Sequence, residues 1–422
     1  MNVTVSKGNL HDFSVCLPAS KSLSHRALIA AGLSSTACRL HHVADNNDTS
    51  ATMHALKMRG ASFAKDGEDW LVHGCSHGAI PAQPIDCGES GSTLRFLIPL
   101  FAAQPGTAAF TGHGRLMQRP QSVYADLFAK QGLRFEKQGD ILYAEGPLSC
   151  GTYQAAGDVS SQFISGLLFA LPLLPGESRI IVSEPFESES YVGLTLDILH
   201  KAGIRVNRQG NTFTVPGNQT YHMPAYTVPG DDSQAAFFAA LALISGKDGD
   251  ILNMDHDSHQ GDHVILDHMR AFGAEVSEIP NGYHIHAADP HGAVIDLGDC
   301  PDLGPMEFAM AACVRGDSTF LHAGRLRIKE SDRIACMKEE MAKLGCMLED
   351  DGDTVYVHGG KGALRPSAVL GHNDHRIVMA LSILAACSEQ PITIEDAQAV
   401  NKSYPDFYQD LARTGAKISY DH

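Results

Sequence analysis

A short glycine-centred pattern recurs six times along the chain of 422 residues, at a nearly constant interval of about 71 residues. In each copy a helix-forming stretch ends at a glycine, and a short alternating stretch typical of a strand follows it. The six glycines are Gly60, Gly132, Gly203, Gly273, Gly345 and Gly415. This period predicts six copies of one supersecondary unit and therefore limits the possible folds strongly.

The third copy shows the predicted order of elements within one unit. Ser161 can cap a helix with apolar residues at helical spacing, and residues 179–182 form a short β-branched strand. A second helix ends at Gly203, which favours a left-handed cap. Residues 204–207 and 212–215 then form a hairpin, so that each copy is predicted to be α-β-α-β-β.

The two ends of the chain are predicted to combine. The sixth copy stops at residues 418–422, before its last strand, whereas residues 3–5 form an extra strand at the N-terminus. We expect that strand to complete the sixth unit. Six units are too much chain to pack around one hydrophobic core. We therefore predict an α/β protein of two globular domains, each of three βαβαββ units, rather than a solenoid.

The predicted domains are joined by a two-stranded hinge. One domain comprises residues 1–17 and 228–422, which hold repeats four to six, and the other comprises residues 18–227, which hold repeats one to three. The two crossings fall near residues 17–19 and 226–229, where prolines are present. A hinge of this kind would allow the domains to close over a ligand.

Composition excludes several classes of protein. The net charge of −17 and the absence of a basic face disfavour binding to nucleic acid or to a membrane. No apolar stretch reaches the roughly 20 residues of a membrane span, and residues 1–7 lack the charged-then-apolar pattern of an export signal. We therefore expect a cytoplasmic protein. Ten dispersed cysteines without a C-x-x-C pair indicate neither disulfides nor a zinc site.

Small polar clusters precede the first helix of each copy and are typical of helix caps. They include Ser20-Lys21-Ser22, residues 89–93, residues 160–162, residues 231–234, Asp302 and residues 373–376. Most such clusters only cap a helix. However, four cations lie in or just after a first helical turn, where the helix dipole disfavours them unless an anion binds. These cations, which indicate a phosphorylated ligand, are Lys21, Arg26, Arg95 and Arg376.

A second set of cations is concentrated in three short segments of the sequence. It consists of Arg115, Arg119, Arg325, Arg327, Lys329, Arg333 and Lys402. Arginine binds phosphate and carboxylate oxygens through paired hydrogen bonds, although Arg325 and Arg327 could equally be solvated surface charges. On one helix, Lys329 and Arg333 would face the same side. Asp302 and Glu330 could carry protons beside these cations.

Two further motifs carry less weight. Residues 255–263 are rich in histidine and aspartate, but their spacing fits no compact metal motif, and a polar loop is the favoured interpretation. The segment from Gly88 to Gly91 lacks the lysine and the length of a Walker phosphate-binding loop, and it does not match the dinucleotide-binding motif G-x-G-x-x-G.

Six ordered blocks, spanning nearly the whole chain, resemble the 5-enolpyruvylshikimate-3-phosphate (EPSP) synthase family. They are residues 17–27, 86–95, 159–163, 328–333, 373–376 and 402–406. The resemblance implies transfer of the enolpyruvyl group of phosphoenolpyruvate to the 5-hydroxyl of shikimate 3-phosphate, with release of phosphate, in aromatic amino acid biosynthesis. It implies no metal and no cofactor, and we expect a monomer whose partners are these two small-molecule substrates.

The resemblance also implies roles for individual residues. Those expected to hold shikimate 3-phosphate are Ser22, Arg26, Ser160, Ser161, Ser188, Asp302 and Lys329, and Gln162 would reach both substrates. Those expected around phosphoenolpyruvate are Lys21, Gly91, Arg119, Arg333, Arg376 and Lys402. Asp302 would take the proton of the attacking hydroxyl, and Glu330 and Lys21 would move protons at the methylene carbon of a tetrahedral intermediate.

Some residues depart from the family pattern. Glu89 replaces a common asparagine, Phe96 a frequent proline, and Arg325 a frequent asparagine, while the segment after Ser188 lacks a proline. Gly91 suggests susceptibility to the inhibitor glyphosate. Phe96 is an unusual residue close to Gly91 in the sequence, and it bears on the same expectation.

Two alternatives stay open. UDP-N-acetylglucosamine enolpyruvyltransferase shares the architecture, but it usually has asparagine at the position of Ser22 and a cysteine in the loop at residues 111–115, which this chain lacks. A catalytically silent anion-binding protein would have lost its proton carriers, whereas Asp302, Glu330 and Lys21 are present.

Overall fold

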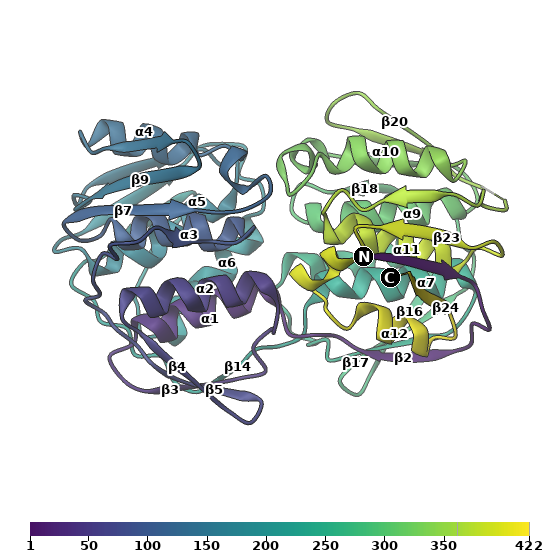
Figure 1. Cartoon of the computed structure of the whole chain (residues 1–422), viewed down its shortest axis with the longest axis horizontal. Coiled ribbons are helices and arrows are strands. Elements are labelled where there is room, and N and C mark those ends of the chain that lie inside the picture. Colours follow the sequence, from purple (N-terminus) through teal and green to yellow (C-terminus); the bar gives the residue numbers. More distant parts are fainter. Residues whose placement is uncertain (361, 422) are drawn as a thin grey trace. The chain divides into compact units, whose positions relative to one another are not determined.

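The structure is a computed structural model that describes residues 1–360 and 362–421, the side chain of Asp421 excepted. The chain divides into two compact units. Unit 1 is Met1–Pro18 with Pro229–His422, and unit 2 is Ala19–Val228. The chain therefore passes from one unit to the other twice (Figure 1).

Unit 2 holds the first three repeats. The first contains α1 (Lys21–Leu33), β3 (Cys38–His41), α2 (Asn47–Arg59), β4 (Ser62–Asp66) and β5 (Asp69–His73). The second contains β6 (Ile85–Asp86), α3 (Gly91–Phe101), β7 (Gly106–Thr111), the 3-10 helix η1 (Leu116–Gln118), α4 (Ser122–Lys130), β8 (Phe135–Gln138) and β9 (Ile141–Gly146). The third contains β10 (Thr152–Ala155), α5 (Ser161–Ala170), η2 (Leu171–Leu173), β11 (Ser178–Val182), α6 (Glu189–Lys201), β12 (Asn207–Gln209) and β13 (Thr212–Val215), after which β14 (Tyr226–Thr227) follows.

Unit 1 begins with β1 (Asn2–Ser6) and β2 (Phe13–Cys16) and then holds repeats four to six. The fourth contains α7 (Asp232–Ser245), β15 (Gly249–Leu252), η3 (Gly261–Val264), α8 (Ile265–Ala271), β16 (Ala274–Ile279) and β17 (Gly282–Ala287). The fifth contains β18 (Val294–Asp296), η4 (Pro301–Leu303), α9 (Gly304–Cys313), β19 (Ser318–Leu321), η5 (Gly324–Ile328), α10 (Arg333–Lys343), β20 (Met347–Asp350) and β21 (Val355–His358). The sixth contains β22 (Ala368–Leu370), α11 (His375–Ala386), β23 (Ile392–Glu395), η6 (Ala397–Lys402), α12 (Phe407–Arg413) and β24 (Lys417–Asp421).

Six four-stranded sheets confirm the six predicted repeats. In the second repeat the strand order is β6-β7-β9-β8, in which β6 and β7 are parallel and the other pairs are antiparallel. The other repeats follow the same order. The hairpin of the third repeat is also confirmed, but its first strand begins at Asn207 rather than at residue 204.

The N-terminal strand completes the sixth sheet, as the sequence predicts. β1 pairs antiparallel with both β23 and β24, and Val3 faces Ile394 on one side and Tyr420 on the other. Figure 1 shows this purple strand among the yellow C-terminal ones. Two short strands show a further exchange that the sequence analysis missed. β2 precedes the first crossing and joins the sheet of repeat four, whereas β14 precedes the second crossing and joins that of repeat one.

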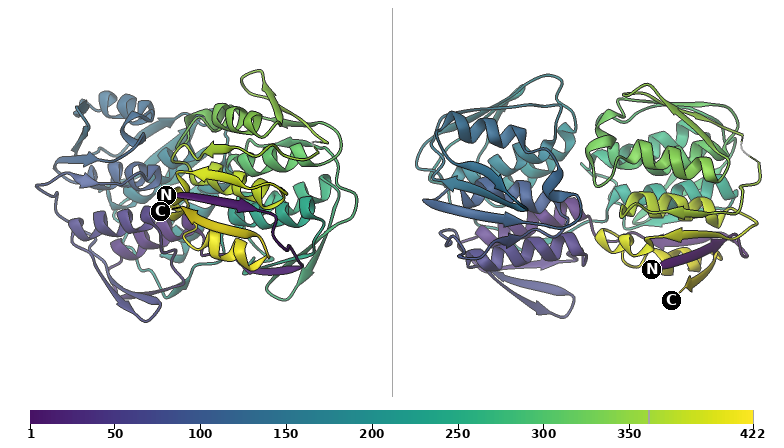
Figure 2. Two further views of the ribbon diagram at one scale, coloured as in Figure 1. Left: turned by 45° about the vertical axis from the view of Figure 1, so that its right-hand side comes forward. Right: turned by 45° about the horizontal axis from the view of Figure 1, so that its top comes forward.

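The first helix of each repeat forms the core of its unit. Nearly every residue of α1, α3 and α5 in unit 2, and of α7, α9 and α11 in unit 1, is buried. Figure 1 and the turned views of Figure 2 show these helices inside and the sheets toward the outside of each unit. The buried faces of these helices are rich in alanine and leucine. Their polar residues are therefore found mainly at the amino ends, where several of the candidate functional side chains lie.

Five of the six predicted caps are confirmed. The side chains of Ser20, Ser90, Ser160, Asp231 and Asp374 each accept a hydrogen bond from a backbone N–H in the first turn of the helix that follows. The prediction for Asp302 is wrong, because η4 intervenes and α9 begins at Gly304. No helix among residues 1–360 and 362–421 is long and apolar enough to cross a membrane.

Candidate active site

In unit 1, the carboxylate of Asp302 lies among three cations. Its Oδ1 is 2.9 Å from Nη1 of Arg333 and 3.3 Å from Nζ of Lys329, and its Oδ2 is 3.3 Å from Nη2 of Arg376. The short η4 turn, rather than a helix cap, places Asp302 there. Because the carboxylate is not used as a cap, its oxygens face the cations.

Arg333 lies at the centre of this cluster, with a side chain that is only 1% exposed. Its Nε donates to Asp374 at 2.9 Å and its Nη2 donates to Glu330 at 2.8 Å. Although burial opposes the charge, the carboxylates of Asp374, Glu330 and Asp302 raise the pKa of Arg333 above its usual value. The guanidinium is therefore held charged and fixed in orientation.

Lys329 joins the cluster by a different route from the predicted one. Asp332 caps α10 by accepting from the backbone N–H of Ala335 at 3.0 Å, so the helix begins at Arg333. Lys329 therefore precedes the helix, and the prediction that it shares a helix face with Arg333 is wrong, although both reach Asp302. Burial lowers the pKa of the Lys329 ammonium, and Asp302 acts in the opposite direction.

Arg376 and Lys402 complete this group of cations. Arg376, in the first turn of α11, donates from Nη1 and Nη2 to the carbonyl and hydroxyl oxygens of Ser233, at 3.1 and 2.7 Å. Lys402 donates to the carbonyl of Asn373 at 2.5 Å. The structure thus brings together the unit 1 residues that the sequence analysis singled out, which we call the unit 1 cluster: Asp302, Lys329, Glu330, Arg333, Arg376 and Lys402.

The two arginines that the sequence left open have different surroundings. Arg327 pairs with Asp350 and lies 3.5 Å from Asp332, so it is a structural ion pair at the side of the cluster. Arg325 lowers the pKa of Lys329, which places its charge close to that ammonium.

In unit 2, Lys21 is the first residue of α1, and its ammonium lies 3.2 Å from Oδ2 of Asp48 in the first turn of α2. Arg26 is buried one turn deeper. It donates to Thr195, to the carbonyl of Ser22 and to the carbonyl of Tyr191, each at 2.8 Å. Burial lowers the pKa of Arg26 to about 10. Arg26 therefore fixes Ser22 and the start of α6, where Ser188 lies at the cap position with a left-handed backbone.

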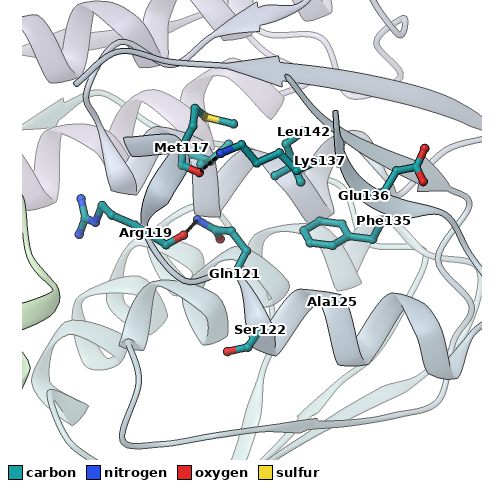
Figure 3. A pocket seen from close by; sticks show the side chains of 10 residues that line it. Met117, Arg119, Gln121, Ser122, Ala125, Phe135, Glu136, Lys137 and Leu142 are labelled. Atoms are coloured by element: carbon teal, nitrogen blue, oxygen red, sulfur yellow. Dashed lines mark hydrogen bonds between the residues drawn. The ribbon is translucent and has the colours of Figure 1, made fainter. Parts of the chain in front are cut away.

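Gly91 and Arg119 are direct neighbours in unit 2. A Cβ atom built at Gly91 would lie 2.6 Å from Nη1 of Arg119, so the guanidinium occupies the space that only a glycine leaves open. Behind Arg119 is a cavity of about 310 Å³, between η1, α4 and the β8-β9 hairpin. Figure 3 shows the Arg119 guanidinium turned away from the cavity, while Lys137 donates to the carbonyl of Met117 at 2.7 Å.

Ser160, Ser161 and Gln162 form the start of α5. Gln162 donates to Ser92 at 2.9 Å, and its Oε1 accepts from Arg95 at 2.9 Å. Arg95 also donates to the carbonyl of Pro120 at 3.0 Å, and therefore links α3 to the segment that carries Arg119. These amide and hydroxyl groups, with Lys21 and Arg119, form what we call the unit 2 face.

Three supporting residues were missed as functional by the sequence analysis. Asp374, Ser233 and Asp48 hold Arg333, Arg376 and Lys21, respectively. Asp374 and Ser233 were in clusters that we interpreted as caps, and their second role is visible only in the side-chain contacts. Asp48 lies in an ordinary helical turn and gave no signal.

The histidine-rich segment at 255–263 is a polar loop that runs into η3, and two of its histidines contact residues outside the segment. His263 lies 2.8 Å from the buried carboxylate of Asp232, and His256 lies 3.0 Å from the carbonyl of Gly282. Among the described residues, the one group with metal-ligand spacing is Glu339, Glu340 and His372, elsewhere in unit 1. Lys343 already pairs with Glu340 at 2.8 Å there.

Comparison with known proteins gives a consistent result. The model of the family described as EPSP synthase (3-phosphoshikimate 1-carboxyvinyltransferase) matches residues 7–411. The 3-phosphoshikimate 1-carboxyvinyltransferase of Clostridium kluyveri is 40% identical over 96% of this chain and 95% of its own length. The enzyme of the same name from Clostridioides difficile is 36% identical, again over 96% and 95%.

Solved structures agree in fold. EPSP synthase from Acinetobacter baumannii superposes with a TM-score of 0.80 at 24% identity, over 100% of both chains. The enolpyruvyl transferase NikO from Streptomyces tendae gives a TM-score of 0.77 at 16% identity, over 99% of this chain and 98% of its own. The predicted two-domain α/β fold is thereby confirmed, and on the family match and the curated relatives the chain belongs to the EPSP synthase family, the 3-phosphoshikimate 1-carboxyvinyltransferases of the shikimate pathway.

Proposed function

We propose that this chain transfers the enolpyruvyl group of phosphoenolpyruvate to the 5-hydroxyl of shikimate 3-phosphate, with residues of the unit 1 cluster and of the unit 2 face both taking part in the reaction. Family membership supports the reaction, and the geometry within each unit supports the residues. We further propose that the enzyme acts as a cytoplasmic monomer and that the two units close on the substrates. Susceptibility to glyphosate belongs to the same proposal.

The observation that carries this proposal is the Asp302 carboxylate among Lys329, Arg333 and Arg376. A proton acceptor for the 5-hydroxyl has to be ionised, and nearby cations have to neutralise the incoming phosphate and carboxylate groups. The side chains of Asp302 and Lys329 are each 22% exposed, whereas those of Arg333 and Arg376 are at most 2% exposed, so the carboxylate and the ammonium are the most accessible of these four groups.

The reaction divides into addition and elimination. The 5-hydroxyl oxygen attacks the C2 carbon of phosphoenolpyruvate as Asp302 accepts its proton, and a proton is added to the methylene carbon, which gives a tetrahedral intermediate. The intermediate then loses a proton from that carbon as its C–O bond to phosphate breaks, which restores the double bond. Glu330 and Lys21 are the groups we assign to the carbon; Glu330 accepts from Arg333 at 2.8 Å, and Lys21 donates to Asp48 at 3.2 Å.

The unit 2 face supplies cations for the donor. Phosphoenolpyruvate carries a carboxylate and a phosphate ester on the same carbon, C2, and burial of such a charge density requires arginine or lysine partners. Arg119 lies against Gly91, and Lys21 lies at the start of α1, so both cations are next to helix amino ends that also favour anions. Arg26, Ser22, Ser160, Ser161 and Ser188 are assigned to shikimate 3-phosphate.

A phosphate-release assay tests the proposed function. Phosphoenolpyruvate is offered with either shikimate 3-phosphate or UDP-N-acetylglucosamine, and the Asp302→Asn variant is the matched control because it keeps the shape and removes the base. We expect phosphate release when shikimate 3-phosphate is the acceptor and none when UDP-N-acetylglucosamine is the acceptor. In the variant we expect the rate with shikimate 3-phosphate to fall by at least roughly a hundredfold. Phosphate release with the UDP-sugar, or no release with shikimate 3-phosphate, would reject the proposal.

A further inference from the structure

Two rungs of polar contacts connect the helices of the unit 2 face. The outer rung is the pair of Lys21 on α1 and Asp48 on α2. One turn deeper, at the i+4 positions of the same helices, His25 Nδ1 lies 2.8 Å from Oγ1 of Thr52, and Thr52 lies 2.6 Å from Oγ1 of Thr93 on α3. We call the set His25, Thr52, Thr93 and Ser90 the inner rung.

The inner rung ends at the amino terminus of α3. Thr93 Oγ1 lies 2.8 Å from the hydroxyl of Ser90, which caps α3 immediately before Gly91, and 3.3 Å from the carbonyl of Asp48. Thr93 therefore touches both the cap beside Gly91 and the residue that holds Lys21. All four members of the inner rung are at most 1% exposed.

Counting protons gives the direction of these bonds. A hydroxyl has one proton to donate. The arrangement that makes every one of these contacts a hydrogen bond has Thr93 donating to Ser90 or Asp48, Thr52 donating to Thr93, and His25 Nδ1 donating to Thr52. In that arrangement His25 carries its hydrogen on Nδ1, and its Nε2 has no hydrogen-bond partner among the described residues.

Burial, together with the nearby cations Lys21 and Arg26, lowers the pKa of His25 well below 6.5, so the ring is neutral. Its Nε2 is buried without a hydrogen-bond partner among the described residues, and the His25 ring meets Phe96 edge-on, with ring centroids 6.5 Å apart. A phenylalanine would fill that space without leaving a polar nitrogen unpaired. The bond to Thr52 is the contact that distinguishes the histidine from such a residue.

We propose that His25 is a positioning residue for the unit 2 residues assigned to phosphoenolpyruvate. Through Thr52 and Thr93 it fixes the positions of α1, α2 and α3 relative to one another along their axes. It thereby fixes the placement of Lys21, and of Gly91 against Arg119. This inference rests on the proposed function. A misplacement of Lys21 or Gly91 weakens the binding of phosphoenolpyruvate, whereas the contacts assigned to shikimate 3-phosphate are held by a separate chain of bonds from Arg26 through Thr195 to Ser165.

The test measures the ratio of the KM for phosphoenolpyruvate to the KM for shikimate 3-phosphate. His25→Phe removes the donor and keeps the ring, Thr52→Val removes the hydroxyl on a second helix, and His25→Asn restores an N–H near the Nδ1 position. We expect the ratio to rise roughly tenfold in the first two variants and to stay within threefold of wild type in His25→Asn.

Two controls separate positioning from a general loss of stability. Ser165→Ala breaks the other buried chain of unit 2, so we expect its ratio to fall. Ser382→Ala removes a buried hydroxyl in unit 1, which lies 2.7 Å from the carbonyl of Val378 and 3.0 Å from Tyr408, and its ratio is expected to stay unchanged. A ratio that rises by threefold or less in both His25→Phe and Thr52→Val would overturn the inference.

A second readout uses the intact wild-type protein. The ¹⁵N shifts of His25 report which ring nitrogen carries hydrogen; a protonated Nδ1 supports the inference, and a protonated Nε2 overturns it. This readout decides the case even if a variant fails to fold. Absence of wild-type phosphate release would reject the proposed function, and the tautomer would still be measured independently.

Discussion

The two units repeat one fold but hold their functional groups by different physical means. In unit 1, buried ion pairs converge on Arg333, whose partners are Asp302, Glu330 and Asp374. In unit 2, neutral hydroxyl and imidazole groups connect the helices beneath Lys21, Gly91 and Arg119. The repeat therefore fixes where the helix amino ends lie, and the side chains at those ends decide whether ion pairs or neutral hydrogen bonds hold the helices in place.

The largest effect is expected where a charge is removed from the unit 1 cluster. Arg333→Met fills similar space but leaves three carboxylates without their common partner, so we expect a loss of about 3–5 kcal/mol in the free energy of unfolding. Urea denaturation followed by circular dichroism measures it. Arg315→Met, which removes an exposed pair with Asp289, is the control and should change little. Equal losses in the two variants would contradict the comparison.

Arg119→Ala is expected to act on the donor alone. The variant removes a cation from the unit 2 face, and we expect the affinity for phosphoenolpyruvate to fall by at least roughly tenfold, with shikimate 3-phosphate much less affected. Calorimetric titration of each ligand measures both. The exposed Arg115, four residues earlier, supplies the control Arg115→Ala. If both ligands lose affinity equally, Arg119 is not a donor contact.

Gly91→Ala is a gentler change at the same place. The added methyl group would meet Nη1 of Arg119 at 2.6 Å, so the flexible guanidinium has to move while the backbone stays. We expect the KM for phosphoenolpyruvate to rise several-fold, by about 1 kcal/mol of binding, with the unfolding midpoint nearly unchanged. Gly193→Ala in α6 is the matched helical control, since nothing lies within 4 Å of its added atom. An unchanged KM in Gly91→Ala would separate Gly91 from the donor site.

The smallest effects concern pH, and the two units should respond in opposite directions. The pKa of His25 in unit 2 is lowered by burial, so its contribution is present above pH 6.5 and is lost as the pH falls below that value. In unit 1, burial opposes the charge of His268, but Glu307 at 2.7 Å raises the pKa of this histidine. That contribution is present below pH 6.5 and is lost as the pH rises through the folded pKa.

Unfolding free energies of wild type, His25→Asn and His268→Asn between pH 5 and 9 test this difference. The difference in the free energy of unfolding between wild type and His25→Asn should shrink as the pH falls. The corresponding difference for His268→Asn should shrink as the pH rises. The same sign of pH dependence in both variants would show that the two units do not differ in this way.

Much of the fold followed from the repeat. The glycine period and the incomplete sixth copy predicted six units and the role of the N-terminal strand, because both depend on long-range pattern rather than on local propensity. The exchange of β2 and β14 could not be predicted in detail. β14 is only two residues long, so its pairing with β3 depends on tertiary position rather than on sequence.

The candidate site was predicted in its members but not in its geometry. Short motifs identified Asp302, Lys329, Arg333 and Arg376, yet the spacing of Lys329 and Arg333 suggested one helix, and the Asp332 cap instead starts α10 at Arg333. Asp48 and Thr52 gave no signal at all, because an aspartate and a threonine in a helix are ordinary until their partners on neighbouring helices are known.

The most direct test of the account is a crystal structure of the chain with shikimate 3-phosphate and an unreactive analogue of phosphoenolpyruvate. We predict that the analogue's anionic groups lie within hydrogen-bond distance of Lys21 or Arg119 from unit 2 and also of Arg333, Arg376 or Lys402 from unit 1, with the 5-hydroxyl beside Asp302. An analogue that contacts one unit alone, or binds away from both sets of cations, would contradict the proposal that residues of both units bind the donor.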